Sequence, residues 1–167
     1  MNDAAQTVST PETLPARSRL VHEALRAAGI AGDIVVLPDA AHTAVAAAEA
    51  LGVEVGAIAN SLVFECDGAP LLVMTSGAHR VDTAALAERL GRGRITRASA
   101  DAVRDATGQV IGGVAPTGHP APLETIVDEA LAAYPQLWAA GGTPHTVFPL
   151  TFDELVALTS GRVAKVD

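Results

Sequence analysis

The chain has few aromatic residues and only one cysteine and one lysine, and each shortage excludes a class of protein. Aromatic residues make up 3% of the 167 residues and hydrophobic residues 49%, so the core must be built from Ala, Val, Leu and Ile. A single cysteine, Cys66, can form neither an internal disulfide nor a zinc-ribbon pattern. No apolar run is long enough to span a bilayer and no signal peptide is recognisable. We therefore expect a cytoplasmic protein without a membrane partner.

Basic residues are also in short supply. The 11 Lys and Arg residues face 19 Asp and Glu residues, which gives a formal net charge of −8 at pH 7. This charge argues against a protein that coats nucleic acid without sequence preference, and we expect no DNA partner. It does not exclude a protein that grips only the end of an RNA through a local basic patch.

The length predicts a single domain. Residues 1–13 are polar and are expected to form a flexible tail, with the domain over 14–167. Helical and strand-like segments then alternate, which indicates an α/β or α+β domain. The predicted helices span 16–28, 43–51, 83–90, 100–106 and 152–160, and the predicted strands span 34–37, 61–66, 71–75, 123–127, 137–140 and 147–150, with shorter strands near 95 and over 162–166.

Several turns and helix ends carry specific local signals. Asp67-Gly68 between two strands is a strong hairpin signal. Asp82 is a plausible N-cap, and Gly91 stands where a left-handed residue ends a helix. Thr151 followed three residues later by Glu154 is a capping box.

Two glycine-rich loops in the last third of the chain are the strongest functional signal. The first runs over 112–120 and the second over 139–145. Paired glycines let the backbone approach a ligand closely, and such loops can aim N–H groups at a phosphate or at a developing oxyanion. Glycine-proline turns are also common as plain structural turns, and the motif alone favours that interpretation.

The order of the segments resembles the YbaK/prolyl-tRNA-synthetase-associated domain family, whose members remove wrongly attached amino acids from tRNA. The matching stretches are 47–53, 58–64, 112–118, 125–128 and 140–142. The glycine-x-x-x-proline of the family corresponds to Gly112 and Pro116. The resemblance implies a mixed β-sheet surrounded by helices. It also implies a hydrolase: a trans-editing aminoacyl-tRNA deacylase that cleaves the ester of a misacylated tRNA.

The resemblance places the site as follows. Hydrolysis of this labile ester needs a held substrate, a placed water and oxyanion donors rather than a full triad. The expected catalytic residues are Asn60, Ser61, Gly112 and Gly113, and the expected substrate-binding residues are Pro116, Thr117, Gly118, Arg80, Gly141, Gly142 and His145. No cofactor or metal is expected. The partner is the 3′ end of a misacylated tRNA carrying a small amino acid (Ala, Cys, Ser or Thr), with an aminoacyl-tRNA synthetase as an optional further partner.

Asn60 is the main departure from the family pattern. The best-known branches have a lysine at this position, whereas here the only lysine is Lys165, outside any family motif. An amide cannot supply a positive charge, but it can donate to a carbonyl or hold a water. Arg80, just after a strand, is a candidate replacement for the charge, and a salt bridge to Asp82 is the equally weighted alternative.

The remaining polar residues carry weaker signals. The histidines are scattered without metal-ligand spacing, and His145 and His119 stand out only because each closes a glycine loop. A surface histidine is the favoured interpretation of His119. The arginines at 89, 92, 94 and 97 form a basic cluster, for which a solvated helix end is favoured over an RNA contact.

Two other functions remain open. One is a catalytically degenerate binding or regulatory protein of the same fold, which binds tRNA, a nucleotide or an amino-acid derivative. The other is a hydrolase that acts on a different small ester or amide.

Overall fold

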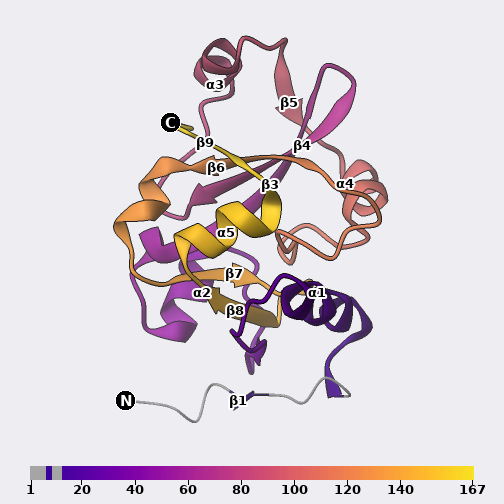
Figure 1. The fold of residues 1–167 in the computed structure, drawn as a ribbon, viewed down its shortest axis with the longest axis vertical. Coiled ribbons are helices and arrows are strands. Elements are labelled where there is room, and N and C mark those ends of the chain that lie inside the picture. Colours follow the sequence, from indigo (N-terminus) through magenta and orange to yellow (C-terminus); the bar gives the residue numbers. More distant parts are fainter. Residues whose placement is uncertain (1–6, 9–12) are drawn as a thin grey trace.

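One mixed β-sheet organises the computed structural model, which describes residues 7–8 and 13–167 (Figure 1). The order across the sheet is β1-β2-β8-β7-β3-β4-β6-β9, and β5 pairs with β3 off this path. The pairs β3–β7, β4–β6 and β6–β9 are parallel and the others are antiparallel. The strands are β1 (Thr7–Val8), β2 (Val35–Val36), β3 (Ile58–Cys66), β4 (Ala69–Ser76), β5 (Ile95–Arg97), β6 (Glu124–Asp128), β7 (Leu137–Ala140), β8 (Thr146–Leu150) and β9 (Arg162–Ala164). The mixed α/β fold expected from the sequence is confirmed.

Four of the five α-helices in the described part of the chain begin at a residue whose side chain caps the first turn. Asp82 accepts a hydrogen bond from Ala85 N–H, and Gly91 ends the same helix with φ +64°. The capping box is present, since Thr151 and Glu154 each bond the other's backbone N–H. The helices are α1 (Ala16–Ala27), α2 (Ala44–Leu51), α3 (Thr83–Leu90), α4 (Ala100–Thr107) and α5 (Phe152–Thr159), with short 3₁₀ turns η3 (Val55–Ala57) and η4 (Glu129–Ala133). These helix predictions are confirmed to within one or two residues, whereas the 3₁₀ turns were not predicted.

The β3–β4 hairpin forms the centre of the sheet. Its turn has positive φ at both Asp67 (+54°) and Gly68 (+79°), the conformation of the two-residue turns that suit twisted hairpins. Strand β3 is longer than the sequence predicts, because it begins at Ile58 instead of residue 61. This extension carries β3 past the hairpin and alongside β7, where the candidate site lies.

Both faces of the sheet are covered, and alternate residues of a strand serve opposite faces. Phe148 of β8 shares a core cluster with Leu25 of α1 on one face. Its chain neighbour Val147 packs with Ala47 of α2 on the other face. Leu86 of α3 anchors a third cluster. The core that the composition requires is therefore divided between the two faces of the sheet.

The N-terminal segment differs in part from the expected tail. Within the predicted tail, residues 1–6 and 9–12 lie outside the described residues. Thr7 and Val8 pair with Val36 and Val35, so this short stretch adds β1 to the sheet.

Candidate functional site

A pocket opens where two parallel strands separate. β3 pairs with β7 only at Ile58 and Ala59, and it pairs with β5 only from Phe64 onward. Along this edge, Asn60 and Ser61 therefore have no neighbouring strand among the described residues. Backbone groups alternate along β3, so those of Ser61 face this gap while those of Asn60 face β4, and other parts of the chain enclose the gap. Ligands of open sheets containing parallel strands commonly bind at such a point, beyond the carboxyl ends of the strands.

Four segments enclose this pocket. They are the edge of β3, the first glycine loop, the second glycine loop with β7 and β8, and the start of α2. The lining residues are Ala41, His42, Thr43, Ala44, Ala47, Ile58, Ala59, Asn60, Ser61, Gly112, Val114, Trp138, Ala139, Ala140, Thr143, Pro144, Thr146 and Val147. The volume open to the centre of a water molecule is about 40 Å³. That is more than the about 10–15 Å³ that one water requires, so the pocket holds a water or a small side chain.

Asn60 and Ser61 present different groups because they alternate along β3. Ser61 lies opposite Met74 in β4, and its hydroxyl donates to the Met74 sulfur at 3.2 Å. Asn60 lies opposite Thr75, and its half-buried amide has no hydrogen-bond partner within the described ranges. The Asn60 amide is therefore the more available of the two side chains.

The first glycine loop brings one free N–H group to the pocket. Gly113 N–H already donates to the Val110 carbonyl at 3.0 Å, whereas Gly112 N–H has no acceptor among the residues described. Gly112 has φ +92°, and a Cβ there would lie 3.2 Å from His42 Nδ1. Gly112 thus supplies both the donor and the close approach, and the N–H of Gly113 is committed to the loop itself.

His42 is a pocket residue that the sequence analysis did not single out. It is exposed at the rim, packs on Gly112, and is the one titratable side chain in the lining. It directly precedes Thr43, whose hydroxyl caps α2 by accepting from Ala46 N–H at 3.1 Å. No local signal in the sequence singles out His42, because its contact with Gly112 exists only in the folded chain.

The second glycine loop shapes the opposite wall, although its glycines do not line the pocket. Gly141 N–H donates to the Thr146 carbonyl at 2.7 Å, and Gly142 packs against the backbone of Arg17 in α1. The lining comes from Thr143 and Thr146, whose hydroxyl oxygens are 2.9 Å apart. Both glycines are buried, so their contribution is to let this loop pass close to α1.

The other predicted substrate-binding residues lie elsewhere. Pro116, Thr117 and Gly118 line a separate open groove that also includes Leu158 of α5. Gln109 fixes this part of the loop: its side-chain oxygen accepts from Ala115 N–H at 2.7 Å, and its amide donates to the Thr117 carbonyl at 3.2 Å. Arg80 and His145 are exposed and are not part of the pocket lining.

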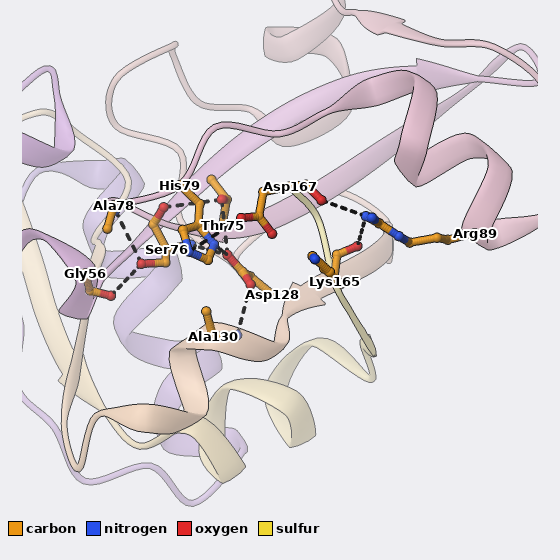
Figure 2. A network of polar contacts seen from close by, with 10 residues as sticks. All are labelled: Gly56, Thr75, Ser76, Ala78, His79, Arg89, Asp128, Ala130, Lys165 and Asp167. Atoms are coloured by element: carbon orange, nitrogen blue, oxygen red, sulfur yellow. Dashed lines mark hydrogen bonds and ion pairs between the residues drawn. The ribbon is translucent and has the colours of Figure 1, made fainter.

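A buried carboxylate organises the neighbouring end of β4 (Figure 2). Asp128, 1% exposed, accepts from Ser76 N–H at 2.9 Å and from Ala130 N–H at 3.0 Å, and it lies 3.1 Å from His79 Nδ1. The Thr75 hydroxyl also donates to it, at 3.4 Å. This cluster connects β4 to β6, on the side of β4 away from β3, the strand that carries Asn60. It is separate from the pocket.

The pocket itself carries no formal charge. No Asp, Glu, Lys or Arg is among its lining residues. Within the described part of the chain, no group of three or more His, Cys, Asp or Glu side chains is placed to hold a metal ion. No described helix is long and apolar enough to cross a membrane. Apart from the imidazole of His42, the lining therefore offers only backbone and side-chain dipoles to a charge that develops in the pocket.

The pocket lies inside the part of the chain that matches a known protein family. Residues 38–158 match the model of the aminoacyl-tRNA editing domain, a range that holds every lining residue. The chain is similar to the uncharacterized protein YwhH of Bacillus subtilis (strain 168), with 28% identity over 132 residues, covering 78% of this chain and 83% of that protein.

Two solved structures share the fold over nearly their whole length. A candidate trans-editing enzyme for prolyl-tRNA synthetase is 42% identical, with a TM-score of 0.87, covering 93% of this chain and 99% of that one. A scaffold protein used for computational epitope grafting is 39% identical, with a TM-score of 0.85, covering 92% and 98%. The family model spans most of the chain, and the pocket lies inside the matched range. The protein therefore belongs to the aminoacyl-tRNA editing domain family.

Proposed function

We propose that this protein is a trans-editing aminoacyl-tRNA deacylase, which hydrolyses the ester of a misacylated tRNA. The observation that carries the proposal is the pocket between β3 and β7, whose lining includes both Asn60, with its unpartnered amide, and Gly112, with its unpartnered N–H. An ester needs no more than a placed water and a donor for the oxyanion, because its leaving alcohol is far better than an amine.

Gly112 is the oxyanion donor in this proposal. Its N–H has no other acceptor, and its position is fixed by the packing of its backbone on His42. In a pocket whose lining has no Asp, Glu, Lys or Arg, such a preorganised dipole stabilises a developing negative charge more than it would in water. Gly113 and the second glycine loop have a structural role, because their close packing holds the pocket wall that carries Gly112 in place.

Asn60 holds the attacking water. Its amide oxygen accepts a hydrogen bond from the water, and its NH₂ group is available to the substrate carbonyl or the α-amino group. An amide performs this task without a charge, which fits a lining that has no carboxylate to balance a lysine. Asn60 is therefore compatible with a working site, even though the family's best-known branches carry a lysine there.

His42 carries the proton. The water oxygen bonds to the ester carbon while its proton passes to the imidazole, and the carbonyl becomes an oxyanion at Gly112. Collapse of the tetrahedral species breaks the bond to the ribose oxygen, which takes the proton from His42. The products are the free amino acid and the deacylated tRNA. His42 suits both transfers because it lies at the rim, where the ribose enters.

The size of the pocket selects a small amino acid. The open volume of about 40 Å³ and the walls of Ala47, Ile58, Ala139 and Val147 leave no space for a large side chain. Exclusion by clash is effective, whereas binding distinguishes a single methylene only about 10–200-fold. The substrate is thus a tRNA charged with a small residue, and the printed description of the similar trans-editing enzyme makes prolyl-tRNA synthetase the first candidate for a partner.

Deacylation of a panel of tRNAs charged with Ala, Cys, Ser, Thr and Pro tests the proposal. Gly112→Ala should lower kcat/KM about 10²-fold, because strain at φ +92° and contact with His42 displace the donor. Gly91→Ala is the matched control. It also introduces alanine at a positive φ, +64°, but in open space at the C-terminal end of α3. Wild-type turnover that Gly112→Ala removes and Gly91→Ala retains supports the deacylase. Binding of tRNA without turnover of any ester would favour the degenerate binding protein instead.

A further inference from the structure

The four arginines of the basic cluster divide into two that are bound within the fold and two that are not. Arg92 forms ion pairs with two carboxylates, at 2.8 and 2.7 Å, and Arg89 donates to two backbone carbonyls in the segment after β9. Arg94 and Arg97 are both exposed, and neither has a hydrogen-bond or ion-pair partner in the part of the chain that the structure describes. These two guanidinium groups are therefore available to a ligand.

Arg94 and Arg97 line one open groove between α3 and β5, two elements that lie side by side at the top of Figure 1. We call it the arginine groove. Its remaining lining comes from small or apolar residues and two threonines: Thr83, Ala84, Ala87, Ile95 and Thr96. No Asp or Glu is among these lining residues, and the groove measures about 380 Å³, against about 40 Å³ for the pocket between β3 and β7. In a chain with a net charge of −8, such a groove is a local site for an extended anion.

The arginine groove lies on the same edge and the same face of β3 as the pocket. Both β7 and β5 pair along one edge of β3, β7 before the gap at Asn60 and β5 beyond it. Arg97 lies directly opposite Phe64 of β3, so these two side chains point to the same face of the sheet. Phe64 and Asn60 are four residues apart in β3 and also share a face, about 13 Å apart along the strand. A chain molecule that ends at Asn60 can therefore continue along β3 to Arg97.

The chemistry of the two sites is complementary. The pocket lining contains no Lys or Arg, so it offers no charged partner to the backbone of an RNA. A guanidinium group binds a phosphate through two parallel N–H donors and keeps its charge at any working pH. We propose that Arg94 and Arg97 bind phosphodiester groups of the unpaired 3′ strand of the substrate RNA, upstream of the nucleotide that carries the ester. This inference rests on the proposed function and names the part of the substrate that is held outside the pocket.

Binding of uncharged tRNA at increasing NaCl concentration tests the inference without relying on turnover. Each phosphate contact to a single strand contributes about 0.7 to the slope of log Kd against log salt concentration. Arg97→Gln and Arg94→Gln should each reduce this slope by about 0.7 and raise the Kd about threefold at low salt. The matched control is Arg19→Gln on α1, a helix that packs on the other face of the sheet. It removes the same charge from an exposed arginine and should leave the slope and the Kd as in wild type.

A kinetic measurement separates this inference from the deacylase itself. Arg97→Gln should raise the KM for aminoacyl-tRNA about threefold and leave kcat unchanged, because the phosphate contact is equal in the ground and transition states. Hydrolysis of 2′(3′)-O-aminoacyl-adenosine, which has no phosphodiester, should not change. If no ester is turned over but the salt slopes change as predicted, the deacylase fails and the arginine groove stands. Equal slopes in wild type and Arg97→Gln, or an equal loss in Arg19→Gln, would overturn the arginine groove whatever the activity.

Discussion

Gly113 and Thr143 pack backbone on backbone, and this contact joins the two glycine loops. A Cβ on Gly113 would lie 2.5 Å from the carbonyl carbon of Thr143 and 2.8 Å from the nitrogen of Pro144. Backbone atoms cannot move aside as the end of a flexible side chain can. The glycine at 113 is therefore required by the approach of the second loop, which carries Thr143 and Pro144 to the pocket wall.

Replacement of Gly113 should separate the two loops. Gly113→Ala is expected to cost about 1–3 kcal/mol in the free energy of unfolding, the usual penalty of overpacking. It should also reduce deacylation, because the wall formed by Thr143 moves. Urea denaturation and a turnover assay measure the two effects. Gly68→Ala, in the hairpin turn with nothing within 4 Å, controls for the loss of a glycine and should retain activity. Full stability of Gly113→Ala would contradict the close contact.

Asp128 should be among the most sensitive positions for stability. Asp128→Ala removes the acceptor of two backbone N–H groups and leaves His79 without its buried partner (Figure 2). Leaving a buried donor such as the Ser76 N–H without an acceptor costs about 1–3 kcal/mol. Thermal or urea unfolding measures the change. The control is Asp101→Ala, since the Asp101 carboxylate is 89% exposed and its pair with Arg104 spans 3.5 Å, so a change below about 0.5 kcal/mol is expected.

The parts of the fold that could be predicted are those that short segments decide. The N-caps at Asp82 and Thr151 and the turn at Asp67-Gly68 depend on residues within a few positions of the backbone they shape, and all three are confirmed. The start of β3 at Ile58 was missed because pairing with β7, a tertiary contact, sets it.

Pocket residues could be predicted from the sequence only where their place in a strand or loop determines their position in the fold. Asn60 and Gly112 both line the pocket, because the strand edge and the loop place them there, and their roles stay predictions. His42 was missed because only the folded contact with Gly112 brings it to the rim. Gly118 carries the same composition signal as Gly112, yet it packs on Val21 of α1, and no local pattern distinguishes these two roles.

His119 should make stability depend on pH. Its Nε2–H donates to the Ala115 carbonyl at 2.8 Å, and burial lowers the pKa of His119 below its usual 6.5. The unfolded chain then binds more protons than the folded one between the two pKa values, so stability falls as the pH drops below about 6.5. His119→Gln should reduce this dependence in urea titrations between about pH 7.5 and about pH 5.5, one unit either side of the usual value. His145→Gln, which removes an exposed imidazole, should leave the dependence as in wild type; equal slopes in all three proteins would refute the assignment.

Cys66 should be inert in the folded protein. Its side chain is 1% exposed, and burial together with the neighbouring Asp67 carboxylate raises the pKa of the thiol. Because the thiolate is the reactive form, alkylation should occur only when the protein unfolds. Iodoacetamide labelling followed by mass spectrometry should therefore be slow in buffer and rapid in denaturing urea. Fast labelling of the native protein would show that the end of β3 opens far more readily than the packing of Cys66 implies.

The most direct test of the central claim is a deacylation time course of wild type beside Asn60→Ala on tRNA charged with each small amino acid. The account predicts that wild type removes at least one of them well above the buffer rate. Asn60→Ala should lose about 10²-fold or more of that rate, because the attacking water is no longer held. A wild type that leaves every ester at the buffer rate, or an Asn60→Ala variant as fast as wild type, would contradict the claim that the pocket between β3 and β7 is a hydrolytic site.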